Sequence, residues 1–363
     1  MSASDPSLPL AGVRVLEIGG GVAAAFATRF LTGYGADVVR SEGPEGALTS
    51  DEQAFLLLGK RRIAADARAL RELALAADLV VEDGAPGALA ARGLDPRALR
   101  REKSALVITS LTPFGQDGPH AGFAASNLVA HAAGGILSLT GVMTRPPLQN
   151  GGGQAWMLLG LNGFSASLCA LFGALVHGEG DWLDISAQEC AAGMLEYAGP
   201  RAAYDGTPAA RLGNRVNAIW GIYACADGFA GICALQRQAP AFLQLLGDPE
   251  LLAPRFLDPA QRVLADAELG ARVERWFADK SKRELLELGE KHKVPVGAVL
   301  TPLELLANGS LAERAFFDAV ETPSGVARIP GRPFLGLGWR GGELHAAAAD
   351  TETVARDWLG SAP

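Results

Sequence analysis

Short apolar runs alternate with glycine-rich turns and helical patterns through the first third of the chain. Residues 13–18 read Val-Arg-Val-Leu-Glu-Ile, which predicts a buried strand, and three glycines then precede an alanine-rich helical pattern over 22–31. Further apolar runs that predict strands lie at 36–40, 77–82 and 104–110. Because a strand, a helix and a second strand in this order form a βαβ unit with a right-handed crossover, the pattern predicts an open, Rossmann-like α/β sheet.

The pattern changes after this sheet. Residues 126–200 read as mostly helical, and 239–292 read as helical again. Between them, Asp227 and Gly228 supply a turn between two strand-like runs, which predicts a hairpin over 221–235. The second half of the chain is therefore expected to combine helices with a hairpin.

The apolar run from Ala155 to Val176 is long enough to be considered as a membrane span. Polar and small residues, among them Asn162 and Ser165, interrupt it, so the pattern favours a buried helix of a soluble protein and no membrane partner is expected. The first ten residues carry neither a basic segment nor an apolar core, which argues against a signal peptide. These features predict a cytoplasmic location.

Composition narrows the possible functions. The chain has 363 residues, of which 49% are hydrophobic, and a formal net charge of -8. An acidic balance argues against general nucleic-acid binding, which requires a basic surface. The four cysteines show no C-x-x-C spacing, so neither a disulfide framework nor a metal site is expected.

Six short motifs follow one another along nearly the whole chain. In single letters they read LAGVRVLE from Leu10, YGADVVRSE from Tyr34, GKRRI from Gly59, ADLVVE from Ala77 with Pro86-Gly87, PFGQDGP from Pro113, and VPVGAVLTPLELL from Val294. In this order they resemble the class III CoA-transferases, the family that includes formyl-CoA transferase, carnitine CoA-transferase and α-methylacyl-CoA racemase. Each fragment alone is weak, but the ordered set is strong evidence for the fold.

The resemblance implies a domain organisation and a reaction. It implies a Rossmann-like large domain over residues 1–200, completed by 325–363, and a smaller α+β domain over 201–324. It also implies an interlocked homodimer, or a heterodimer with a paralogue. The expected substrates are an acyl-CoA thioester and a carboxylic acid, with coenzyme A as substrate and no permanently bound cofactor.

Coenzyme A carries phosphates, so its site needs cations and exposed backbone N–H groups. The glycines before the first helix offer both a close backbone approach and the positive end of a helix dipole. The basic run at 60–62, together with Arg68, is a candidate phosphate clamp. Family members often have an arginine before the two proline-glycine-like turns, where this chain has Gly43 and Ala85. The residues predicted to bind CoA are Val22, Ala23, Arg61, Arg68, Asp83, Gly84 and Arg92.

The resemblance also implies an aspartate nucleophile, which this chain lacks. Counting along the motifs places that aspartate at Trp156, Leu159 or Gly160, and no Asp or Glu occurs between His120 and Gly178. The racemase route needs a histidine at the position of Ser126 and an acid at the position of Asn127, and this chain has neither there. Racemase activity by that route is therefore not expected.

Three residues near the vacant position are candidates for catalysis. Gln154 follows three glycines and can donate a hydrogen bond to a thioester oxyanion, while His131 lies one helical turn beyond Asn127. A structural explanation fits each of these residues equally well. His131 can be a packed core residue, and the glycines before Gln154 can serve only to make the loop flexible. Three functions stay open: an acyl-CoA enzyme that uses other residues, a CoA-transferase whose acid comes from elsewhere, and a non-catalytic CoA-binding subunit that pairs with an active paralogue.

Overall fold

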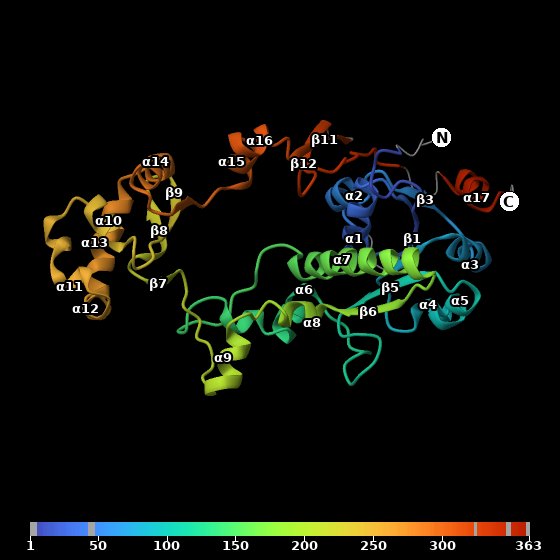
Figure 1. The fold of residues 1–363 in the computed structure, drawn as a ribbon, viewed down its shortest axis with the longest axis horizontal. Coiled ribbons are helices and arrows are strands. Elements are labelled where there is room, and N and C mark those ends of the chain that lie inside the picture. Colours follow the sequence, from blue (N-terminus) through green and yellow to red (C-terminus); the bar gives the residue numbers. More distant parts are fainter. Residues whose placement is uncertain (1–5, 43–47, 323–324, 346–349, 361–363) are drawn as a thin grey trace. The chain divides into compact units, whose positions relative to one another are not determined.

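The computed structural model describes residues 6–42, 48–322, 325–345 and 350–360. The chain forms two compact units (Figure 1). The first contains residues 1–136, 149–206 and 309–363, and the second contains the rest. Gly43 and Pro44, where the sequence departs from the family pattern, lie outside the described residues.

A parallel sheet forms the centre of the first unit. Within the described residues it has six strands in the order β3-β2-β1-β4-β5-β6. Their bounds are β1 Arg14–Gly19, β2 Asp37–Glu42, β3 Arg61–Ile63, β4 Leu79–Glu82, β5 Val107–Thr112 and β6 Trp182–Ser186. Every neighbouring pair is parallel, so the predicted Rossmann-like α/β sheet is confirmed.

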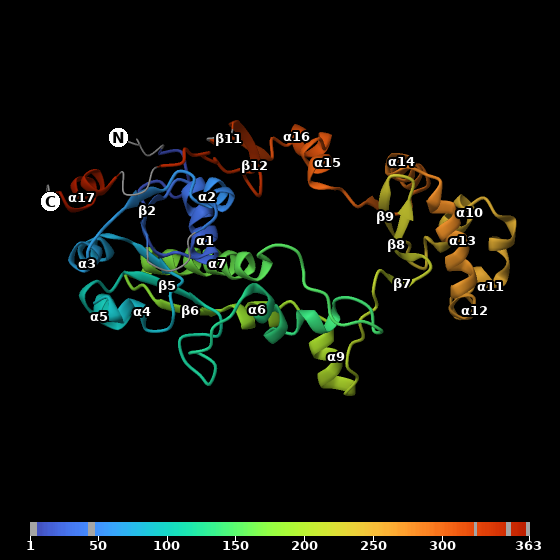
Figure 2. The same ribbon diagram turned by 180° about the vertical axis from the view of Figure 1, so that it is seen from behind.

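Helices cover both faces of this sheet (Figures 1 and 2). On one face, Val15 of β1 packs with α1 (Val22–Gly33) and α7 (Gln154–His177). On the other face, the next residue, Leu16, packs with the helices α3 (Ala67–Ala76), α5 (Pro96–Glu102) and α17 (Thr351–Leu359). Successive strand residues point to opposite faces, which is why strands buried on both sides read as unbroken apolar runs.

Shorter elements complete the first unit. Its remaining helices are α2 (Ser50–Leu56), α4 (Ala88–Ala91), α6 (Asn127–Ala133), α8 (Ala187–Ala192), α9 (Ala198–Asp205) and α16 (Gly309–Glu313). A 3-10 turn, Ile136–Leu139, lies where the chain passes from the first unit to the second. A separate antiparallel hairpin joins β11 (Phe317–Thr322) to β12 (Gly325–Pro330).

Helix α7 is buried over its first half and exposed over its second. Gly160 faces α1, where an added Cβ would lie 2.5 Å from the carbonyl oxygen of Ala23. Phe172, Leu175 and Val176 are 68%, 83% and 55% exposed. The predicted buried helix is therefore only half right, because the sheet and α1 cover only part of its length. Among the described residues, α7 is the one helix that is long and apolar enough to cross a membrane by length and composition.

The second unit is an antiparallel sheet packed against helices. Its described strands, in the order β10-β9-β8-β7, are β7 (Arg215–Asn217), β8 (Trp220–Cys225), β9 (Gly228–Cys233) and β10 (Val296–Ala298). The helices are α10 (Ala239–Leu245), a 3-10 turn (Pro249–Leu252), α11 (Pro254–Leu257), α12 (Pro259–Leu264), α13 (Asp266–Ala278), α14 (Lys282–His292) and α15 (Pro302–Leu306). Strands β8 and β9 form the predicted hairpin, which is confirmed.

The two units differ from the predicted domain boundaries, since residues 201–206 and 309–324 belong to the first unit and 137–148 to the second. The β11–β12 hairpin pairs Thr322 with Gly325, so a boundary between 324 and 325 would divide a hydrogen-bonded element. Residues 137–148 belong to the second unit, where Val142 bridges to Leu212. The differences at the hairpin and at 137–148 arise from pairing between segments, which is not visible in the local pattern of the sequence.

Candidate functional site

The order of strands places a topological switch point between β1 and β4, to which we refer as the crevice. The chain leaves β1 toward β2 on one side and reaches β4 on the other, so the connections after these two strands diverge at their carboxyl ends. Ligands of open α/β sheets bind at such a switch point. Here the loop 19–21 leads into α1, and Asp83 and Gly84 follow β4.

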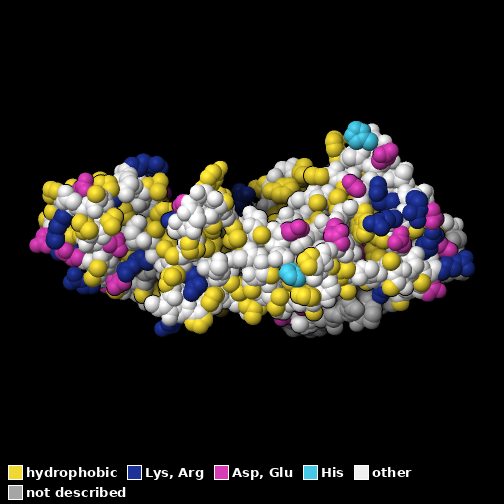
Figure 3. Space-filling view, turned by 90° about the horizontal axis from the view of Figure 1, so that it is seen from below, with side chains coloured by type: hydrophobic (Ala, Val, Ile, Leu, Met, Phe, Trp, Pro, Cys, Tyr) yellow, Lys and Arg dark blue, Asp and Glu magenta, His cyan; other side chains and the backbone are white. Residues whose placement is uncertain are grey.

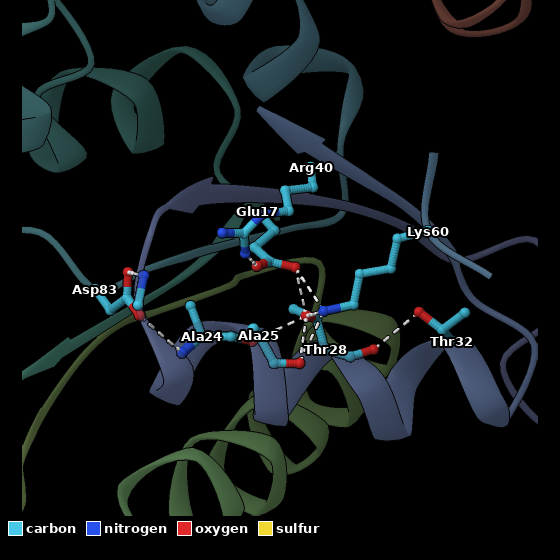
Figure 4. A network of polar contacts seen from close by, with 9 residues as sticks. Glu17, Ala24, Ala25, Thr28, Thr32, Arg40, Lys60 and Asp83 are labelled. Carbon is cyan, nitrogen blue, oxygen red and sulfur yellow. Dashed lines mark hydrogen bonds and ion pairs between the residues drawn. The ribbon is translucent and has the colours of Figure 1, made fainter. Parts of the chain in front are cut away.

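A carboxylate of the chain itself occupies the N-terminus of α1. Asp83 accepts hydrogen bonds from the backbone N–H groups of Gly21 (3.3 Å) and Ala24 (3.1 Å) (Figure 4). Burial raises the pKa of Asp83, and the two N–H donors oppose this increase. An added Cβ at Gly19 or Gly21 would overlap the Asp83 carboxylate, and Gly19 has a φ of 149°. Close approach of Asp83 therefore accounts for these two glycines without a phosphate.

Behind this loop lies a fully buried charge cluster (Figure 4). Glu17 pairs with Arg40 and with Lys60, whose Nζ lies 2.9 Å from the Glu17 carboxylate, and Thr28 donates to the same carboxylate at 2.6 Å. Burial would raise the pKa of Glu17, but the two cations outweigh it and lower the pKa to about 2. Burial also lowers the pKa of Lys60 to about 8. With Asp83 included, two cations face two carboxylates.

The structure does not place Lys60 and Arg61 of the basic run in one surface cluster. Lys60 is 0% exposed inside the charge cluster. Arg61 lies on β3, where its guanidinium bonds Asp37 (3.0 Å) and Asp357 (2.8 Å). The alternation of side chains along a strand separates these two cations. Arg68 is exposed on α3 and pairs with Glu72 at 3.0 Å, so the structure does not bring Arg61 and Arg68 together on one element.

Other predicted CoA-binding residues lie around the crevice. Val22 and Ala23 form the first turn of α1, beside the Asp83 carboxylate. Gly84 donates its N–H to Glu82 at 2.9 Å, and Arg92 ends α4 and is partly exposed.

Sequence reasoning missed Arg40, which ends the second apolar run beside this crevice. Its side chain is nearly buried, and its Nε has no hydrogen-bond partner in the described part of the chain. The signal in the sequence that could have pointed to Arg40 was a charged residue at the end of an apolar run that predicts a buried strand.

Two of the three candidate catalytic residues, Asn127 and Gln154, lie at the N-terminus of α7, and His131 lies within α6. Asn127 accepts a hydrogen bond from the N–H of Ala155 (2.8 Å) and donates to the carbonyl oxygen of Gly152 (3.1 Å), so it caps α7 from α6. Gln154 is the exposed first residue of α7. His131 is 2% exposed, and its Nδ1 has no hydrogen-bond partner among the described residues.

The three positions at which the motifs place the family's aspartate differ in how much room they leave for a side chain. Gly160 has no room for a side chain against α1, and Leu159 is 1% exposed in the core. Trp156 is half-buried in the first turn of α7 and is the one position of the three that tolerates a side chain near solvent. No carboxylate comes from this helix. Among the described residues no group of three His, Cys, Asp or Glu side chains has the arrangement of a metal site.

A family model described as CoA-transferase family III matches residues 10–347. The chain belongs to CoA-transferase family III. It is 29% identical to succinate--glutarate CoA-transferase of Agrobacterium fabrum over 89% of this chain and 88% of that protein. It is also 29% identical to the BbsE subunit of succinyl-CoA:(R)-benzylsuccinate CoA-transferase of Thauera aromatica, over 85% and 84% of the two chains.

A solved structure of a relative supports the same assignment. The crystal structure of a CAIB/BAIF family protein from Brucella suis superposes with a TM-score of 0.85 at 27% identity, covering 97% of this chain and all of that one. The resemblance, the α/β fold and CoA-transferase activity predicted from the sequence motifs are confirmed at the level of the family.

Proposed function

We propose that this chain transfers CoA from an acyl-CoA thioester to a carboxylic acid, with the acceptor's own carboxylate attacking the thioester. The observation that carries the proposal is the absence of acids between His120 and Gly178, which includes the half of α7 that lies against α1. No side chain of that segment can form an aspartyl anhydride. An acceptor acid bound beside the thioester brings the missing carboxylate with it, and proximity alone can supply a large part of the rate.

The proposed transfer has two balanced steps. An oxygen of the acceptor carboxylate forms a bond to the thioester carbonyl carbon and the C–S bond breaks, which gives a mixed anhydride and CoA thiolate. The thiolate sulfur then attacks the carbonyl carbon that came from the acceptor. The bond from that carbon to the bridging oxygen breaks, and the donor acid leaves with an oxygen atom that came from the acceptor.

The N-terminus of α7 fits the developing oxyanion of both steps. Its helix spans 24 residues, and the positive end of its dipole favours negative charge. Gln154 is exposed at this end, where its amide N–H can donate to the oxyanion. Asn127 holds the end in place through its hydrogen bond to Ala155, so Asn127 acts as a positioning residue.

The CoA moiety is proposed to lie at the crevice between β1 and β4. Gly160 of α7 contacts Ala23 in the first turn of α1, so the crevice and the N-terminal half of α7 are neighbours within one unit. Asp83 balances the charge cluster there and opposes a phosphate close to the loop. Binding through Val22, Ala23, Gly84 and Arg92 therefore relies on backbone groups and on a cation at the rim.

An oxygen-label experiment tests the proposal. Succinyl-CoA and glutarate, the acids in the name of the Agrobacterium relative, are the first pair to assay, followed by a panel of other acyl-CoA and acid pairs. With an ¹⁸O-labelled acceptor, a single turnover should place label in the released donor acid and none in the protein. Label in a protein carboxyl group, found by peptide mass spectrometry, would overturn the direct route. Gln154→Ala should lower kcat by about 100- to 1,000-fold, as the loss of one oxyanion donor does.

We also propose that the chain works in the cytoplasm as a dimer, either interlocked with its own copy or paired with a paralogue. Phe172 and Leu175 of α7 are 68% and 83% exposed in the single chain, and hydrophobic side chains recur across the face in Figure 3. Large exposed apolar side chains at such a density favour burial against another chain. Light scattering of the purified chain, alone and with a co-expressed paralogue, tests this assembly.

A second candidate is a non-catalytic CoA-binding subunit. The acid-free segment favours it, and the relative from Thauera aromatica is named as a subunit. This candidate predicts CoA binding without turnover by the pure chain, and turnover only after a second family member is added.

A further inference from the structure

A pocket of about 370 Å³ lies in the first unit, beside strands β4, β5 and β6. Glu82, Ser110 and Asp184 stand in register across these three strands, so their side chains share one face of the sheet. Trp182, two residues before Asp184, is on the same face, and its Nε1 donates to the Ser110 hydroxyl at 3.0 Å. A polar row of this kind is unusual, because the faces of a parallel sheet are normally apolar.

Among the described residues, no cation is paired with Glu82 or Asp184, two of the carboxyl groups that line this pocket. Glu82 is 3% exposed, and its bonded partners are neutral: the N–H of Gly84 at 2.9 Å and the amide of Gln116 at 3.4 Å. Asp184 accepts the Gln116 N–H at 2.8 Å. In the described part of the chain, neither carboxylate has a Lys, Arg or His nitrogen within 4.0 Å.

This lack of a counterion affects the titration of Glu82. Burial raises the pKa of Glu82 to about 7, and the nearby Asp184 adds to the increase. Buried carboxyl groups are ordinarily paired with a cation, which stabilises the ionised form. A cation that entered the pocket would supply that partner, and Glu82 would then release its proton.

Arg97, which also lines the pocket, already contacts the Trp182 indole. The guanidinium of Arg97, near the start of α5, lies 5.6 Å from the centroid of the indole ring. This distance is in the range of cation–π contacts. An indole face and two unpaired carboxyl groups at one cavity form the combination that recognises ammonium ions.

We propose that this pocket binds a small organic cation, a protonated primary amine with an apolar or aromatic body, between Trp182 and the Glu82–Asp184 pair. The ammonium group donates to the two carboxylates, and the body packs on the indole and on the apolar wall formed by Leu89. A metal ion is a poorer fit, because no group of three ligating side chains is arranged for one among the described residues. A phosphate is disfavoured by the carboxyl groups.

The pocket is separate from the crevice that we propose for CoA. Glu82 and Asp83 are consecutive, so they point to opposite sides of the chain. Asp83 caps α1, whereas Glu82 lines the pocket. The amine site therefore does not depend on the proposed transferase reaction, and it can be tested without acyl-CoA.

Calorimetry with a matched set of probes tests the site. Benzylamine, which is cationic at pH 7, should bind at least tenfold more tightly than neutral benzyl alcohol or anionic benzoate. Its heat of binding should differ between phosphate and HEPES buffers, neither of which contains a primary amine, because Glu82 releases a proton on binding. Three results would each overturn the proposal. They are equal affinity for the amine and the alcohol, tighter binding of benzoate, and no binding of benzylamine at concentrations up to about 10 mM. A single charge-assisted hydrogen bond would already be measurable at that concentration.

Variants locate the binding. Glu82→Gln should abolish the buffer dependence, and Asp184→Asn should weaken benzylamine by about tenfold, the effect expected for one lost charge-assisted bond. Glu72→Gln on α3 removes an exposed carboxylate paired with Arg68 and should leave binding unchanged. If the Glu82→Gln variant does not fold, the affinity of the Asp184→Asn variant for benzylamine tests the proposal by itself. Unchanged affinity and buffer dependence in Asp184→Asn and in Trp182→Phe would reject this placement.

Discussion

Glu82→Gln should change how the stability of the protein depends on pH. Burial raises the pKa of Glu82 from 4.5 to about 7, so the folded chain keeps a proton that the unfolded chain has lost at pH 6. A raised carboxyl pKa therefore lowers the free energy of unfolding as pH rises from 4.5 to 7. Glutamine cannot ionise, so the variant should lose this part of the pH dependence.

The magnitude follows from the pKa difference. The pKa rises from 4.5 to about 7, and at about 1.4 kcal/mol per pKa unit this difference is worth at most about 3.5 kcal/mol. The side chain is 3% exposed, so little of this is screened by solvent, and we expect about 2–3 kcal/mol. The free energy of unfolding of Glu82→Gln, relative to the natural chain, should rise by that amount between pH 4.5 and pH 8.

Urea titrations followed by circular dichroism at pH 4.5, 6 and 8 measure this difference, since all other titrating groups cancel between the two chains. Glu72→Gln is the matched control, because that carboxylate is exposed beside Arg68 and should contribute under about 0.5 kcal/mol at any pH. A constant difference between Glu82→Gln and the natural chain from pH 4.5 to 8 would refute the reasoning. It would mean that water or a cation reaches the Glu82 carboxylate.

Three further perturbations test the rest of the structure. Asp83→Asn removes one negative charge at the N-terminus of α1 and should tighten CoA several-fold in calorimetry, since asparagine still caps the helix; weaker binding would contradict the role of that carboxylate. Lys60→Met leaves a buried carboxylate with one cation fewer and should cost about 3 kcal/mol in urea titrations. Arg68→Ala removes an exposed cation and should change the stability little, so similar costs for the two variants would contradict the observed burial. Gly160→Ala should destabilise by about 1–3 kcal/mol because its Cβ would press on a backbone carbonyl of α1, whereas Gly173→Ala, with nothing within 4 Å, should stabilise α7 by up to about 1 kcal/mol; the opposite order in thermal melts would contradict the packing of the two helices.

Local pattern determined the elements of the first unit more reliably than the site. The apolar run at 13–18 predicted β1, and the alanine-rich pattern after the glycines predicted α1, because each pattern reports burial within one segment. The same local reading placed Lys60 and Arg61 in one clamp. Their separation depends on which neighbours a short strand acquires on each face.

The glycine-rich loop shows the same limit at the site. Its sequence is compatible with a phosphate or with any other anion at a helix N-terminus. The structure fills that position with Asp83, which is more than 60 residues away along the chain. Asn127 likewise caps α7 across 28 residues, and no local pattern distinguishes such a cap from an exposed polar residue.

The sequence by itself determined the family, the parallel sheet, the hairpin of the second unit and the lack of an acid between His120 and Gly178. These properties depend on residue identity and on periods of a few residues, which can be read directly from the chain. Tertiary structure alone decided that Asp83 occupies the α1 N-terminus, that Gly160 has no room for a side chain, and that Glu82 is buried without a cation. Such properties depend on contacts between distant segments, because burial and pairing are set by neighbours in space rather than in sequence.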